Sequence, residues 1–201
     1  MTLIITFIIG TAVLALVFAA LELLVRRGGI SSEVTRRAAH VVAALFAILV
    51  HMVFDGWLFV MIAVIFALLM VLSRRIHLLT SIHNTRRASL GEVYLPLGAA
   101  IAAMIASDDD RIFVASMLVL GLADVAAGIV GDVLRSPHKT WWGSLACAVV
   151  SGLVLIACGV SWPVALVSSV IVAATERLSH RGIDNLTIPA VAALMLMLLQ
   201  P

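Results

Sequence analysis

Eight apolar segments separated by short polar clusters dominate this chain and most constrain its fold. The first, residues 3–25, is long enough to cross a bilayer as a helix, and several others are nearer to about 16 residues. Because 63% of the 201 residues are apolar and only 12% are charged, the chain lacks the polar surface that a soluble fold exposes. The sequence therefore predicts an integral membrane protein. The other segments are residues 38–53, 57–73, 92–106, 112–131, 144–160, 162–176 and 185–200.

No strand alternation, low-complexity linker or convincing internal repeat interrupts these segments. We therefore expect an all-α fold, a polytopic membrane bundle of about eight transmembrane helices formed by residues 1–201 as a single domain. The net charge of +2 comes without a polybasic tail or an aromatic-rich basic patch. Nucleic-acid binding therefore has no support, and the oligomeric state stays open.

Basic residues alternate between the loops. The loops after the first, third, fifth and seventh segments carry 12 of the 13 basic residues, and the other loops carry only Arg111. By the positive-inside rule, the basic loops are cytoplasmic and both termini lie on the opposite side. The polar residues able to do chemistry lie mostly in the third, fifth and seventh loops or in the adjoining helix ends. A transport path would need polarity across the membrane, so the pattern favours a site at the cytoplasmic face.

The fifth segment carries an intramembrane carboxylate. Asp124 lies roughly 10 Å below the predicted helix end, where a carboxylate is costly unless it is paired or bound to a metal. Gly128 and Gly131 lie near its helical face, which indicates either close helix packing or the close approach of an anion. Asp132 and Lys139 follow at the interface. Carboxylates on Mg²⁺ with basic side chains on phosphates are typical of nucleotide sites, although the P-loop pattern is absent.

The third and seventh loops add charged residues at the same face. Arg86 and Arg87 precede Gly91 and Glu92, and the arginine pair fits a phosphate contact as well as a topology signal. In the seventh loop Glu176 is followed by Asp184 and Asn185. Helix capping explains one of the latter two, but it does not explain why these polar residues gather at the face that holds Asp124.

Four motifs occur in the order in which one family carries similar ones. They are TRRAAHV (35–41), GEVYLPLG (91–98), LADVAAGIVG (122–131) with KTWWGS (139–144), and ERLSHRGIDNLTIP (176–189). On these motifs the sequence resembles the CTP-dependent lipid-alcohol kinases, which include phytol kinase, dolichol kinase and the CTP-using diacylglycerol kinases, and are distantly similar to phosphatidate cytidylyltransferase. The chain departs from the family's pattern in having Ala123 where a glycine is usual and Trp142 where an acid is usual.

The resemblance implies a CTP-dependent kinase that phosphorylates the hydroxyl of a membrane lipid alcohol, either an isoprenoid alcohol or diacylglycerol. The enzyme would sit in a bacterial or archaeal inner membrane with its active site facing the cytoplasm. The alternatives are cytidylyltransferase-like transfer of CMP to a lipid phosphate, and a non-catalytic transporter or lipid-binding relative. We expect Asp124, Lys139, Glu176 and Asp184 in catalysis, Asp124, Glu92 and Asp132 on Mg²⁺, and Arg86, Arg87, Gly128, Gly131, Lys139, Gly143, Ser144 and Asn185 on the nucleotide.

Overall fold

The computed structural model describes residues 31–200 except 55, 77–88, 108 and 137, together with residues 16, 19, 20, 23 and 27. Within these residues the chain is helical and contains no β-strand, so the all-α prediction is confirmed. The first apolar segment, residues 3–25, lies almost entirely outside the described residues. The predicted phosphate contacts Arg86 and Arg87 lie outside them as well.

The described helices reproduce seven of the eight predicted apolar segments, since α6, the π-helix η1 and α7 run on as one continuous helix. Segment ends differ by a few residues because hydropathy does not mark polar first turns. The helix α2, for example, begins at Ser32 rather than at 38, and the Ser31 hydroxyl accepts a hydrogen bond from the Val34 N–H at 3.4 Å. The helices are α2 (Ser32–Val53), α3 (Gly56–Arg75), α5 (Gly91–Ala106), α6 (Asp110–Val119), η1 (Leu120–Asp124), α7 (Val125–Val133), α8 (Trp141–Ala157), α9 (Trp162–Leu178) and α10 (Asp184–Leu199).

Three stretches of helix are long and apolar enough to cross a membrane, namely Glu33–Val53, Gly56–Arg75 and Asp110–Val133. The helices α5, α8 and α10 are apolar but shorter. The chain is therefore a membrane protein, as its composition predicts. Eight spans with both termini outside the cytoplasm stay a prediction.

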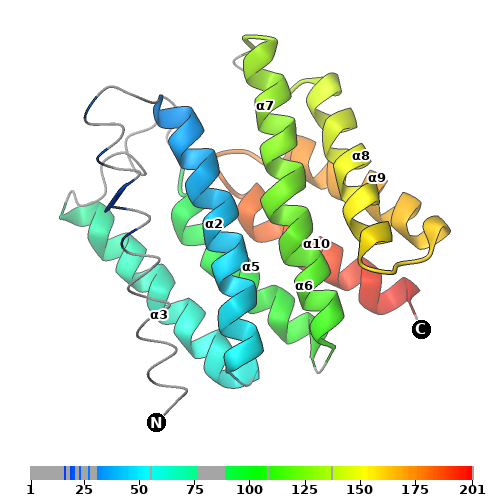
Figure 1. The fold of residues 1–201 in the computed structure, drawn as a ribbon, viewed down its shortest axis with the longest axis horizontal. Helices are drawn as coiled ribbons and strands as arrows, with labels where there is room; N and C mark the ends of the chain where they lie inside the picture. The colour runs from blue at the N-terminus through cyan, green and yellow to red at the C-terminus, as the bar shows by residue number, and fades with distance from the viewer. Residues whose placement is uncertain are drawn as a thin grey trace.

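The continuous helix α6–η1–α7 stands beside α2 in the middle of the bundle (Figure 1). The helix α3 lies at one edge and packs on α5, while α8 and α9 pack together at the other edge; α5 and α10 cross behind the central pair (Figure 1). The core between them is apolar, and its largest fully buried side chains include Phe113, Met117, Leu120, Leu155 and Ile188. Burial of these side chains from several helices holds the helix ends in fixed positions.

Close packing of α5 on α10 fixes the start of α10. A Cβ atom placed on Gly98 would lie 2.8 Å from Cα of Leu186, so the two backbones touch at a position that only glycine fits. The preceding residue on α10, Asn185, donates a hydrogen bond from its side-chain amide to the Gly91 carbonyl at 2.8 Å. Small residues allow this approach between membrane helices, and the contact places Asn185, at the start of α10, beside the first residue of α5.

Candidate functional site

A cavity of about 840 Å³ opens where several helices end, on the side of the bundle at which α2, α8 and α10 begin. Its walls come from the start of α2, the helix η1–α7, the loop from 135 to 140, the end of α9 and the start of α10. These are the elements next to the first, fifth and seventh loops. The structure therefore brings three of the loops that the charge pattern predicts to be cytoplasmic into one polar cavity.

Lys139 forms the centre of an ion-pair cluster in this cavity. Its Nζ lies 2.7 Å from Oε1 of Glu176 and 2.8 Å from Oδ2 of Asp184, and it also donates to the main-chain carbonyl of Glu176. Burial by itself lowers the pKa of Lys139, but the two carboxylates outweigh burial and raise this pKa above the ordinary value of lysine. An ammonium group has three donors, so the three contacts occupy all of them.

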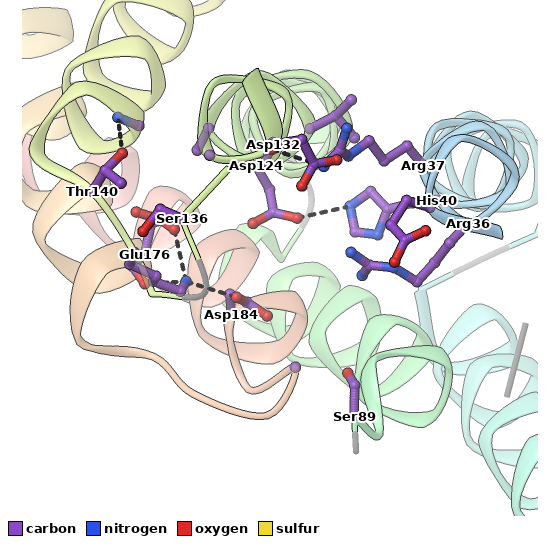
Figure 2. Close-up of a pocket in the computed structure, with 18 of the residues that line it drawn as sticks. Arg36, Arg37, His40, Ser89, Asp124, Asp132, Ser136, Thr140, Glu176 and Asp184 are labelled. Carbon is purple, nitrogen blue, oxygen red and sulfur yellow. Dashed lines mark hydrogen bonds and ion pairs between the residues drawn. The ribbon is translucent and has the colours of Figure 1, made fainter. Parts of the chain in front are cut away.

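Asp124 faces His40 in the cavity (Figure 2). The His40 Nε2 lies 3.9 Å from Oδ2 of Asp124 and 3.3 Å from the carbonyl oxygen of Leu120, where the π-helix begins. Isolated π-helical turns inside α-helices are frequent at functional sites because they change the direction of side chains. Here the π-helix ends at Asp124 itself, and within the described residues the carboxylate has only this loose contact to His40.

Arg37 joins α2 to α7 at the cavity rim. Its Nη2 donates to the carbonyl of Gly128 at 2.7 Å and forms an ion pair with Asp132. A Cβ atom on Gly128 would lie 3.2 Å from Nε of Arg37, so this glycine gives room to the guanidinium. Gly131, by contrast, has nothing within 4 Å of a Cβ atom and faces open space in the cavity wall.

Arg36 lies in the motif TRRAAHV and is marked by the family resemblance together with Arg37 and His40, but no role was predicted for it. Its side chain lies beside His40 in the cavity (Figure 2), and it forms no hydrogen bond or ion pair with any residue in the described part of the chain. The signal was present in the sequence, because Arg36 and His40 are four residues apart and share a helix face, whereas Arg37 points to α7. The motif TRRAAHV therefore contributes Arg36 and His40 to the cavity from one face of α2, while Arg37 reaches α7.

The cavity brings together most of the residues that the sequence analysis singled out. The exceptions among the described residues are two. Ser144 does not line the cavity, and its hydroxyl donates to the Thr140 carbonyl at 3.3 Å. Glu92 lines a smaller adjoining pocket and pairs with Arg74, with Oε1 2.8 Å from Nη1. The predicted residues that line the cavity are Asp124, Gly128, Gly131, Asp132, Lys139, Gly143, Glu176, Asp184 and Asn185.

Trp142, which stands where the family pattern has an acid, is 66% exposed and is not part of the cavity wall. Its neighbour Trp141 instead packs under Arg177, whose guanidinium carbon lies 3.7 Å from the ring centre. The departure at Trp142 therefore changes the surface of α8 and leaves the cavity as described.

Two carboxylate oxygens in the cavity could bind a cation. Among the described residues, Asp124 has only the 3.9 Å contact with His40, and Oε2 of Glu176 is buried without a hydrogen-bond partner there. Within that part, no three acidic, histidine or cysteine side chains form a ready cluster. Mg²⁺ commonly needs only one or two protein carboxylates, because waters and phosphate oxygens complete its shell. The residues present therefore fit this ion.

Comparison with known proteins supports the family resemblance. No family model matches the chain, and no solved structure matches it. A phytol kinase from Synechocystis sp. is 28% identical to it over 192 residues, which cover 87% of this chain and 82% of that protein. The resemblance to the lipid-alcohol kinases is therefore confirmed over most of the chain, while the more distant similarity to phosphatidate cytidylyltransferase stays a prediction.

Proposed function

We propose that this membrane protein, a relative of the lipid-alcohol kinases, transfers the γ-phosphoryl group of CTP to the hydroxyl of a membrane lipid alcohol. One observation carries the proposal. Three motifs of the family, separated by more than 100 residues of sequence from Arg36 to Asp184, meet in one polar cavity beside apolar helices. A nucleotide and a lipid hydroxyl can meet at such a boundary, because one side of it is polar and the other side is apolar.

The chemistry needs positioning and charge more than covalent help. The hydroxyl oxygen of the alcohol forms a bond to the γ-phosphorus, the bond from that phosphorus to the bridging oxygen breaks, and CDP leaves. We assign Mg²⁺ to Asp124, with Asp132 or Glu176 as further ligands, and when bound it supplies positive charge to the phosphates. Asp184, which lines the same cavity, is our candidate to accept the hydroxyl proton.

Two basic residues, Lys139 and Arg36, have different roles in this proposal. Lys139 uses its three donors on Glu176 and Asp184, so it holds these acids in place and reaches a phosphate only by exchanging a partner. Arg36 projects into the cavity beside Asp124 and His40 (Figure 2) and offers a planar, five-donor group suited to phosphate oxygens. We therefore assign the main phosphate contact to Arg36.

The cavity faces the cytoplasm in this proposal. It is built from the ends of helices that the loop charges place inside, which gives a bundle of about eight spans with both termini outside. Cysteine accessibility from either side of sealed vesicles tests this orientation. A probe that cannot cross the membrane should label a cysteine placed at Ser136 in inside-out vesicles and leave it unlabelled in right-side-out ones.

Labelled nucleotide separates the kinase from a cytidylyltransferase. The purified protein is incubated with Mg²⁺ and a panel of lipid alcohols, using CTP labelled at either the γ or the α phosphate, with ATP in parallel. A kinase moves γ-label into the lipid and leaves α-label in the soluble nucleotide. Transfer of α-label would instead identify CMP transfer, and transfer from ATP alone would refute the choice of CTP.

Asp124→Asn tests the site itself. Loss of the charge that is proposed to hold Mg²⁺ should lower turnover by about 100-fold or more, a loss typical of removing one preorganised electrostatic group, while the protein still inserts and purifies. Asp110→Asn is the matched control, because Asp110 starts the same continuous helix at the opposite end and should leave turnover unchanged. A fully active Asp124→Asn variant would remove Asp124 from the mechanism.

A further inference from the structure

A second, much smaller pocket of about 60 Å³ adjoins the main cavity between α2, α3 and α5. Four residues line both spaces, namely Arg36, His40, Ser89 and Asn185. The two spaces therefore adjoin at these residues, and the small pocket lies on the side of the polar cavity toward α3 and α5.

Polarity falls along the small pocket. Its α2 wall runs from Arg36 and His40, which it shares with the cavity, to Ala43. Phe66 lines it from α3, and Glu92, whose charge is paired with Arg74, lines it from α5. The seven residues from Arg36 to Ala43 cover about 10 Å of helix, so the apolar end lies roughly two helical turns deeper in the bundle. A ligand that fills this pocket needs one polar end and one apolar end.

The small pocket exists because small side chains on α2 line it, at a place where two small hydrophobic clusters lie apart from the main core. Ala39 and Ala43 are one turn apart on α2 and leave room where larger side chains would fill it. Ala39 belongs to one small cluster and Met70 to another, both distinct from the main core, and Phe66 packs against each of them. The packing of α2 on α3 at this level is therefore incomplete, whereas main-core side chains such as Phe113 are fully buried.

We propose that this pocket holds the hydrocarbon chain of the lipid alcohol next to its hydroxyl, with Ala39, Ala43, Phe66 and Met70 determining which chains fit. The proposal rests on the kinase function above. The hydroxyl then lies between Arg36 and His40, at the junction with the cavity that receives the nucleotide. The small volume leaves room only for the part of one chain that lies next to the hydroxyl, so we expect alcohols with a single chain to be better substrates than diacylglycerol, which has two.

Substitutions that fill the small pocket and substitutions that widen it should have opposite effects on which lipid alcohols the enzyme accepts. Ala43→Phe places a ring in the pocket and should raise the KM for a single-chain alcohol by about 10-fold or more, a loss equivalent to about 1.4 kcal/mol, without changing the KM for CTP. Phe66→Ala should lower the discrimination against bulkier chains. Leu45→Phe is the matched control, because Leu45 lies on the same helix but is 51% exposed, and it should behave like the wild-type protein.

A binding measurement keeps this inference separate from the kinase function. An alcohol carrying a photoreactive diazirine on its chain, close to the hydroxyl, is cross-linked to the purified protein without nucleotide. Saturable labelling of Phe66 or Met70, suppressed by excess unlabelled alcohol and by Ala43→Phe, supports the chain site even if no phosphoryl transfer occurs. If the enzyme is active but labelling is non-saturable and Ala43→Phe keeps the wild-type KM, the chain site is wrong and the kinase stands.

Discussion

Removing the charge of Lys139 is the sharpest test of how the cavity is held together. Lys139→Met keeps the length and apolar stem of the side chain but leaves Glu176 and Asp184 without their common partner. These carboxylates are only 6% and 14% exposed as side chains. The variant therefore has two poorly solvated negative charges side by side where the wild-type protein has a neutralised cluster.

The distances give the size of the effect. Two unit charges 2.7 Å apart attract by about 6 kcal/mol at an effective dielectric constant of 20, and burial of the charges cancels part of this. Breaking a buried pair by removing one partner typically costs about 3–5 kcal/mol. Since Lys139 is 25% exposed, we expect the lower end, about 3 kcal/mol. For a chain of 201 residues, that corresponds to a fall in Tm of roughly 6–12 °C.

A second substitution separates stability from catalysis. Glu176→Gln in the Lys139→Met background removes one of the two repelling charges and should recover at least half of the lost Tm, measured by thermal unfolding in detergent. Activity should stay low, because Asp184 still lacks the cation that positions it. Two outcomes would refute this reasoning: a Lys139→Met variant as stable as the wild-type protein, or a double variant no more stable than Lys139→Met alone.

Two further predictions follow from single contacts. Gly98→Ala should destabilise the protein by about 1–3 kcal/mol in unfolding experiments, as overpacking does, because the new methyl group meets the α10 backbone; Gly56→Ala, with nothing within 4 Å of its Cβ, should be neutral, and equal effects would contradict the contact. Lys139, the only lysine in the chain, has a raised pKa, so its stabilising charge is complete below the ordinary lysine range and is lost only at higher pH. An amine-reactive reagent at about pH 9 should label it slowly in the wild-type protein and faster in Asp184→Asn, and equally fast labelling would refute the ion-pair cluster.

Helix positions could be predicted well from the sequence, and helix ends less well. Hydropathy alone marks residues 57–73 and 92–106 because apolar runs of that length have no other stable form in a membrane, and the structure has helices Gly56–Arg75 and Gly91–Ala106 there. It does not reveal the π-helix at Leu120–Asp124. A π-helical turn depends on how neighbouring helices pack against it, and the local pattern of residue types does not specify this packing.

The roles of the charged residues divide in the same way. The alternation of basic loops and the carboxylate at Asp124 predict a one-sided anion site, because charge in a membrane is too costly to be placed without a partner. The sequence does not indicate which basic side chain forms an ion pair with which carboxylate. Glu92 was a predicted Mg²⁺ ligand, yet it pairs with Arg74 outside the main cavity, while Arg36, to which we had assigned no role, projects into it.

Composition by itself determined that this chain is a helical membrane protein, and the order of its charges predicts that its chemistry is gathered at one face. Sequence alone is enough for these properties because the bilayer requires apolar side chains, and penalises charged ones, at each position individually. Only the tertiary structure decided that Lys139 contacts both Glu176 and Asp184, that Arg37 pairs with Asp132 on α7, and that a small, partly apolar pocket lies beside Arg36. Those facts depend on which helix ends meet in space, and pairing between distant segments is set by packing rather than by local sequence.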